Sequence, residues 1–308
     1  MKGFIYTSIS IIFVVTIILL FSFQTVHTAD QSARIRVIND FLDSFHKDVE
    51  RAGYISAFRT FVGLEEIISD RGSFVNDSES AFSEIFYNGT YNGTPLTIMN
   101  NSKFSDYMLR VNREASALDI SIIFKINNVL FYQDDPWNVH VNISSNIDVN
   151  DNKGLVAWRY NKTFSFLVPI QNLKDPVYSV NTNGKIHNFI LISNYTDYVN
   201  DTDNSTYNLQ KHINGSYYVA SSEAPNFMMR FEGNLSPDEN GIESMVDLAL
   251  LASQDLTVYT DRSILDYQYF SNQSETLACN VTSMLSWFKI DKDRVADYEI
   301  DKLNYTIC

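Results

Sequence analysis

The chain has 308 residues, of which 45% are hydrophobic and 14% aromatic. This apolar share excludes a disordered chain, because it allows enough burial to offset the entropy of ordering, and the length fits one large or two smaller domains. The 23 basic against 37 acidic residues give a net charge of −14. Such a charge repels phosphate backbones, so nucleic acid is not expected as a partner.

Residues 4–23 form an apolar run of twenty residues without a charge, FIYTSISIIFVVTIILLFSF. Twenty helical residues rise about 30 Å, the thickness of a bilayer core, so the sequence predicts a transmembrane helix over 4–24. A cleaved secretory signal is the alternative, although its apolar region is only about 7 to 15 residues long. Lys2 favours a cytoplasmic N-terminus. The predicted location is the cell membrane, in a single pass, with the bulk of the chain extracellular.

Fourteen Asn-x-Ser/Thr triplets support this exterior location. Chance would give roughly five, so the excess predicts N-glycosylation, although turns rich in Asn and Thr also generate such triplets. The predicted acceptors are Asn76, Asn88, Asn92, Asn100, Asn142, Asn161, Asn194, Asn200, Asn204, Asn214, Asn234, Asn272, Asn280 and Asn304.

The two cysteines, Cys279 and Cys308, are an even number in a chain predicted to face an oxidising exterior. A disulfide between them would close a loop of about 30 residues and stabilise the fold by roughly 3 to 4 kcal/mol. Two unpaired buried thiols are the alternative.

Apolar residues at helical spacing follow the predicted span, at Ile35, Ile38, Leu42, Phe45, Val49 and Ala52. This pattern is typical of one helix face and predicts an amphipathic stem that continues the first helix. After a slip in spacing, the stripe resumes at Ile55, Phe58 and Val62. Gly53 and Gly63 each weaken a helix by about 1 kcal/mol, so we expect a bend in this region.

The start of the chain, Met1-Lys2-Gly3-Phe4 before the apolar helix, resembles the leader of the type IV pilins and pseudopilins, and the many glycosylation triplets resemble archaeal surface pilin-like proteins. The resemblance covers about the first 70 residues. It implies that a prepilin peptidase cleaves after Gly3 and leaves Phe4 as the mature N-terminus. The family commonly has a glutamate at the fifth mature position, where it pairs with the terminal amine during filament assembly. In this chain that position is Ser8.

The rest of the chain shows the period of two that is typical of half-buried strands. Residues 137–149 and 164–170 alternate apolar with polar side chains, and 120–131 supply another strand. Residues 178–192 are predicted to form two strands joined by a hairpin turn at Asn183-Gly184.

These patterns predict an α+β fold, with a long N-terminal transmembrane and stem helix followed by a mainly antiparallel, β-rich head. The predicted parts are a leader at 1–3, the transmembrane helix at 4–24, the extracellular stem at 25–70, a linker at 71–101 and the glycosylated head at 102–308. The head divides into two lobes, 102–193 and 194–308, or forms one.

No pattern in the sequence predicts catalysis or a metal site. The five histidines, His140 among them, lie far apart and without zinc-ligand spacing. Asp134-Asp135 and Asp238-Glu239 could form a glycosidase-like carboxylate pair, but both lie in proline-containing turns, where acids are usually solvated. Residues 148–154 space oxygens as a calcium loop does, but the glycine is one position late, so a hairpin turn is predicted. We therefore expect no enzymatic activity, no cofactor and no metal.

The sequence favours a membrane-anchored, extracellular structural or adhesive protein of the pilin-like type. Its expected partners are the membrane and other surface or pilus-like proteins. The alternatives are a stand-alone anchored ectodomain that binds ligands at the cell envelope and, less favoured, a secreted hydrolase that uses Asp134 or Asp135.

Overall fold

The computed structural model describes residues 2–271, 278–281, 283–303 and 305–306, without the side chains of 2–12, 21, 23–30 and 305–306. The chain divides into two compact units. The first contains Met1–Ala52, Asp106–Asn128 and Ser144–Phe164, and the second contains Gly53–Ser105, Val129–Ile143 and Ser165–Cys308. The architecture is α+β, and its sheets are small, with two or three strands each.

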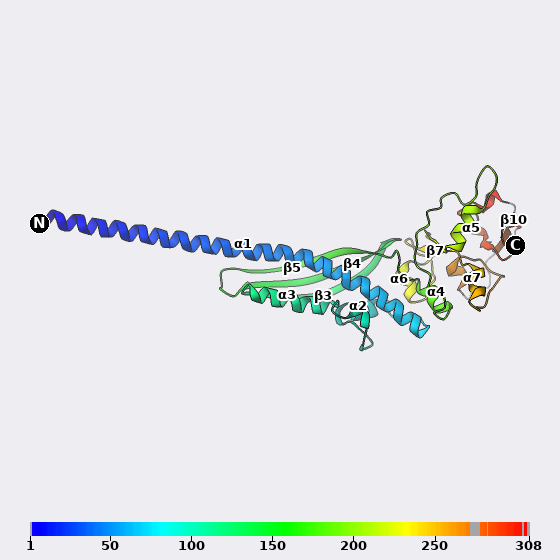
Figure 1. Cartoon of the computed structure of the whole chain (residues 1–308), viewed down its shortest axis with the longest axis horizontal. Coiled ribbons are helices and arrows are strands. Elements are labelled where there is room, and N and C mark those ends of the chain that lie inside the picture. The colour runs from blue at the N-terminus through cyan, green and yellow to red at the C-terminus, as the bar shows by residue number, and fades with distance from the viewer. Residues whose placement is uncertain (1, 272–277, 282, 304, 307–308) are drawn as a thin grey trace. The chain divides into compact units, whose positions relative to one another are not determined.

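Helix α1, Lys2–Arg71, is a single helix of 70 residues, drawn in blue to cyan as one uninterrupted ribbon (Figure 1). It contains no proline, and it ends at Gly72, whose positive φ of 61° and amide hydrogen bond to the Ile68 carbonyl close the last turn. The stop predicted near residue 70 is therefore confirmed.

One buried stripe runs along α1 without the predicted slip. In the first unit its buried members are Ile38, Leu42, Phe45 and Val49, and in the second they include Ala57, Phe61, Leu64 and Ile68. Gly53 is also buried and joins the two sets at a spacing of four residues. Ile55, which the sequence placed on the stripe, is 39% exposed. The stripe continues because glycine, and not a larger apolar residue, occupies the buried position between Val49 and Ala57.

The prediction of a transmembrane helix over 4–24 is wrong. Among the described residues, no helix is long and apolar enough to cross a membrane. The described side chains include an apolar run at 13–20, which rises only about 12 Å against a bilayer core of about 30 Å. The side chains of 2–12, 21 and 23–30 lie outside the described residues. The same finding contradicts the expected single-pass membrane location.

Three long strands form a sheet in the order β3-β4-β5. They are β3 (Ile120–Asp135), β4 (Asn138–Asp151) and β5 (Ala157–Pro169), preceded by helix α3 (Phe104–Ala117). Every second residue of β4 from Val139 to Asp151 is buried, which confirms the predicted alternation. Tight turns join the strands, so neighbours run antiparallel. The turn between β4 and β5 confirms the hairpin predicted over 148–154.

In the first unit, α1 packs on this sheet through aromatic and polar contacts. The rings of Phe45 and Phe124 lie 5.8 Å apart, edge to face. His46 Nε2 lies 2.8 Å from the Tyr160 hydroxyl. Arg34 donates a hydrogen bond of 2.8 Å to Asp151, and this bond lowers the pKa of the Asp151 carboxyl. The pairing explains why an acid occupies a buried position of β4.

The second unit consists of short elements around an aromatic core. Its helices are α2 (Ser78–Asn88), α4 (Pro176–Asn181), α5 (Tyr207–Asn214), α6 (Phe227–Phe231), α7 (Leu248–Ser253) and α8 (Asp266–Tyr269). Its short strands are β1 (Thr90–Tyr91) with β2 (Thr94–Pro95), β6 (Tyr218–Ala220) with β7 (Ile242–Ser244), and β10 (Tyr305–Thr306), β8 (Ala278–Val281) and β9 (Lys289–Asp291). The pairings β1–β2, β6–β7, β8–β9 and β8–β10 are antiparallel.

One aromatic cluster of this unit lies around Phe61 of α1. Its ring lies 4.7 Å from Phe82, 6.3 Å from Phe131 and 5.9 Å from Phe227, centroid to centroid. Phe82 belongs to α2, within the segment 71–101 that the sequence assigned to a linker, and it is fully buried. This segment therefore contributes a large side chain to the core.

The strands predicted over 178–192 are wrong, because this segment begins within a helix. Asp175 caps α4 by accepting a hydrogen bond of 2.8 Å from the Val177 amide, and Pro176 occupies the first turn, where its missing N–H costs nothing. Asn183 and Gly184 do adopt positive φ, 52° and 72°. The predicted turn therefore exists, but it follows a helix and not a strand.

The predicted disulfide is not found. Cys279 is fully buried in β8, and Cys308 lies outside the described residues. Among the described residues no disulfide is present, so the expectation of a disulfide-stabilised fold is corrected.

A first prediction concerns Gly53, where a β-carbon would lie 2.6 Å from Cε1 of Phe166. We expect Gly53→Ala to destabilise the fold by about 1 kcal/mol, because overpacking costs about 1–3 kcal/mol and helix propensity returns about 1 kcal/mol. At Gly63 the nearest atoms are methyl groups of Ile98 and Leu96, at 3.1 and 3.2 Å. Gly63→Ala should therefore be near neutral. Urea denaturation compares the two, and equal stability would contradict the close approach at Gly53.

Candidate functional site

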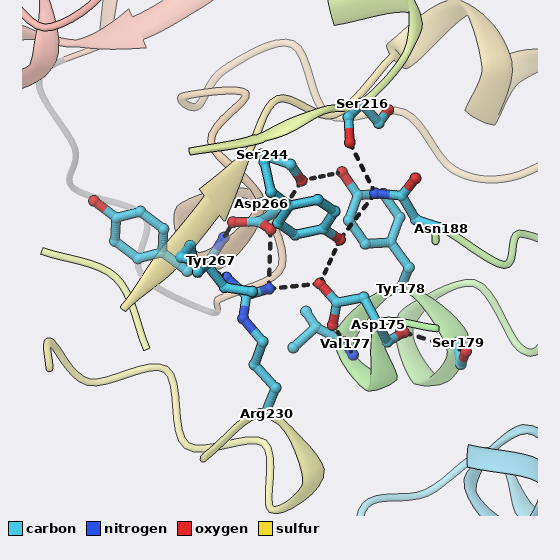
Figure 2. Close-up of polar contacts among 12 residues, drawn as sticks. Asp175, Val177, Tyr178, Ser179, Asn188, Ser216, Arg230, Ser244, Asp266 and Tyr267 are labelled. Atoms are coloured by element: carbon cyan, nitrogen blue, oxygen red, sulfur yellow. Dashed lines mark hydrogen bonds and ion pairs between the residues drawn. The ribbon is translucent and has the colours of Figure 1, made fainter. Parts of the chain in front are cut away.

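The second unit contains a fully buried charge network around Arg230 of α6. Figure 2 shows the Arg230 side chain reaching toward Asp175 and Asp266. Its Nη1 lies 2.6 Å from Oδ2 of Asp175 and 2.9 Å from Oδ2 of Asp266. Its Nη2 donates to the Ile242 carbonyl. All three charged side chains have no exposed surface. The network therefore joins α6 to the N-terminal cap of α4, to the first residue of α8 and to β7.

Neutral side chains complete the network (Figure 2). The Tyr218 hydroxyl donates to Asp175 Oδ2 at 2.7 Å, and the Ser244 hydroxyl donates to Asp266 Oδ2 at 2.9 Å. The Tyr178 hydroxyl lies 2.9 Å from Ser244 Oγ. Each carboxylate thus accepts at least two hydrogen bonds, which buried charge requires.

The network holds two carboxyl groups against one guanidinium. Burial raises the pKa of Asp266 to about 6, against a usual value of 3.8, although Arg230 opposes this rise. The folded state therefore holds a proton that the unfolded chain has released between pH 3.8 and 6. The stability linked to this proton is present below pH 3.8 and is lost as pH rises through 6.

A second prediction compares the loss of the cation, Arg230, with the loss of one of the two acids, Asp266. We expect Arg230→Met to destabilise the protein by about 3–5 kcal/mol, because it leaves buried carboxylates without a cation. Asp266→Asn keeps an oxygen acceptor and removes one negative charge, so it should cost about 1 kcal/mol or less. Urea denaturation at pH 7 measures both. Equal losses in the two variants would contradict the assigned charge balance.

Glu65 of α1 is a second buried acid, 3% exposed. Burial raises its pKa to about 8, although the Lys174 backbone amide donates a hydrogen bond to it. Its Oε1 has no hydrogen-bond partner among the described residues. At neutral pH this carboxyl is therefore mainly protonated in the folded protein.

A third prediction follows from the pKa of Glu65. Between pH 4.5 and 8 the folded protein retains a proton that the unfolded chain loses, so stability falls as pH rises through this window. Glu65→Gln should flatten this part of the stability profile and raise the stability at pH 9 above that of the wild type. Thermal unfolding from pH 5 to 9 tests this, with Glu66→Gln, at the exposed neighbouring position, as the matched control. A Glu65→Gln profile identical to the wild type would exclude the buried proton.

An open cleft of about 830 Å³ lies over β9 and the residues that follow it. Its lining includes four carboxylates, Glu223, Asp291, Asp293 and Asp297, against a single cation, Arg294. Arg294 Nη1 lies 2.8 Å from Asp297 Oδ2, and its Nη2 donates to Ser221 Oγ at 2.9 Å and to Glu243. The lone guanidinium is thus already paired, and the lining keeps a surplus of negative charge.

A smaller hollow of about 400 Å³ shares Arg294 and Asp297 with this cleft. Glu243 lines it and is fully buried. The Tyr298 hydroxyl donates to Glu243 Oε1 at 2.7 Å. Among the described residues, Glu243 Oε2 has no hydrogen-bond partner. The exposed carboxylates of the neighbouring cleft, such as Asp293, can accept hydrogen bonds from a cationic group such as an ammonium or a guanidinium.

A third group of polar side chains lies at the turn between β3 and β4. Asp134, Asp135 and His140 place one donor atom each within 4.8 Å of one another. His140 Nε2 is 2.5 Å from Asp134 Oδ1 and 3.8 Å from Asp135 Oδ2. The sequence predicted two solvated acids and an isolated histidine, because local patterns do not show which side chains a hairpin brings together.

Most of the predicted glycan acceptors lie on the surface. Exposed positions are Asn76, Asn88, Asn92, Asn100, Asn161, Asn194, Asn200, Asn204, Asn214, Asn234 and Asn280. Asn142 is half-buried, and Asn272 and Asn304 lie outside the described residues. Their glycosylation stays a prediction. Gly3 and Phe4 lie in the first turns of α1, and the Phe4 side chain is outside the described residues.

Sequence reasoning missed both buried charge networks. One signal was present in each case, namely a charged residue inside an apolar segment. Arg230 interrupts FMMRF, Glu243 stands in GIESMV, and Asp266 follows Ile264-Leu265. A charge in such a context indicates a buried ion pair.

The chain matches no protein-family model, no curated protein and no solved structure.

Proposed function

We propose that the protein is a structural or adhesive subunit with the helix-and-head plan of the type IV pilins, which assembles with other copies through the N-terminal part of α1. One observation carries this proposal. The helix buries its stripe from Ile38 onward within the two units, but its apolar run at 13–20 is exposed.

Several large apolar side chains of the run at 13–20 are exposed to solvent. Phe13, Ile18 and Leu20 are 66%, 58% and 62% exposed. No charged residue occurs from 13 to 20. A contiguous apolar surface of this kind favours burial against another apolar surface.

A second copy of the chain is the occupant that fits this surface. Every copy presents the same uncharged helix, and two such helices bury each other by packing ridges into grooves. Charged residues follow the run from Asp30 onward, with Arg34 and Arg36 next, so the interface would end where the polar face begins. Ser8 stands where pilins commonly have the assembly glutamate. Apolar packing would therefore hold the copies together without that ion pair.

The negatively charged cleft at Arg294 supports the adhesive part of the proposal. It lies in the second unit, whereas the exposed apolar run belongs to the first. One chain thus carries a surface suited to its own copies and, separately, a surface suited to a cationic partner.

A fourth prediction tests assembly directly. Val14 and Ile18 are exposed and lie one helical turn apart. In the double variant Val14→Asp, Ile18→Asp, each interface would have to bury two unpaired carboxylates, so we expect large assemblies to dissociate to monomers. Sedimentation velocity and negative-stain electron microscopy of the purified full chain measure this.

Ala33→Asp is the matched control, since it adds a charge at an exposed position of the same helix outside the apolar run. It should assemble as the wild type does, and all three proteins should unfold at the same temperature. A monomeric wild type, or unchanged assembly of the double variant, would contradict the proposal.

A further inference from the structure

The β3–β4 hairpin brings together three side chains that the sequence did not connect. β3 ends at Asp135 and β4 begins at Asn138, so only Pro136 and Trp137 separate the strands. Asp134 and His140 therefore meet across the hairpin, and Asp135 lies beside them at the turn. The group contains one imidazole nitrogen and two carboxylate oxygens.

Contacts with neighbouring residues hold two of the three side chains, Asp135 and His140, in place. Asp135 Oδ1 accepts hydrogen bonds from the Trp137 amide at 2.8 Å and from the Asn138 amide and side chain at 3.0 Å each. The other oxygen, Oδ2, is the one that faces His140. The His140 ring stacks on Tyr132, with centroids 5.1 Å apart and planes 24° from parallel. These contacts fix a carboxylate and an imidazole before any ligand arrives.

The third donor, Asp134, is more exposed. The Asp134 side chain is 57% exposed, against 36% for Asp135 and 25% for His140. Its Oδ1 is 2.5 Å from His140 Nε2, whereas two ligands of one tetrahedral zinc ion lie about 3.3 Å apart. An increase of about 1 Å, within reach of an exposed side chain, would convert the pair into two ligands.

The charge of the group favours a divalent cation. Two carboxylates beside one imidazole leave at least one negative charge uncompensated, even when the imidazole is protonated. One nitrogen and two oxygens suit Zn²⁺ and similar transition metals, whereas Ca²⁺ and Mg²⁺ prefer ligand sets made only of oxygen.

We propose that Asp134, Asp135 and His140 bind one Zn²⁺-like transition-metal ion at the turn of the β3–β4 hairpin. The three side chains supply three positions, and water fills the fourth. The ion would link the exposed Asp134 to Asp135 and His140. This metal site is independent of the assembly surface on α1.

Zinc titration of the full-length, chelator-treated protein tests the proposal. Isothermal titration calorimetry at pH 7.5 should give one Zn²⁺ per chain, and excess Zn²⁺ should raise the unfolding temperature. We expect His140→Ala and Asp134→Asn each to weaken Zn²⁺ binding at least about tenfold, because even residues behind metal ligands have effects of that size.

His187→Ala is the matched control, because it removes a histidine remote from the hairpin in sequence and should leave the affinity unchanged. Asp134→Asn changes an exposed side chain, so it tests the site even if His140→Ala fails to fold. No binding of Zn²⁺ to the wild type, unchanged affinity in Asp134→Asn, or equal competition by Ca²⁺ would each overturn the proposal.

Discussion

The burial of one face of α1 is the constraint on which the rest of the structure depends. An isolated amphipathic helix gains little from its own hydrogen bonds, so its stability comes from packing its apolar side chains. Ile38 and Val49 supply that packing in the first unit, and Phe61 and Ile68 supply it in the second, each side chain being fully buried. Burying one such side chain contributes about 1.5–3 kcal/mol. The two units therefore draw on successive parts of the same helix.

Buried charged side chains are the second feature that shapes the structure. In the second unit Arg230 compensates Asp175 and Asp266, whereas at Glu65 burial outweighs the charge of Lys174 and the carboxyl holds its proton instead. Both outcomes follow from the cost of leaving a charge without water. The acids of the Arg294 cleft differ, since Asp293 and Asp297 are exposed to solvent.

Local patterns predicted local structure well and long-range pairing poorly. The alternation along β4, the helical stripe from Ile38 to Val49 and the end of α1 near Gly72 all depend on neighbours in sequence. The segment after Asp175 was misjudged because alternation suggested a strand, whereas the Asp-Pro pair capped a helix. The transmembrane helix was predicted from an uncharged apolar run and the disulfide from an even number of cysteines. Neither is found among the described residues.

By itself, the sequence determined the α+β character, the long N-terminal helix and the antiparallel hairpins, because residue spacing and turn chemistry set these features. Only the tertiary structure decided which charges meet. Asp175, Arg230 and Asp266 are separated by 55 and 36 residues, and no periodic signal links residues so far apart. The same holds on a smaller scale for Asp134 and His140, whose proximity required the turn at Pro136-Trp137 to fold first. Chain topology, and not local propensity, sets these distances.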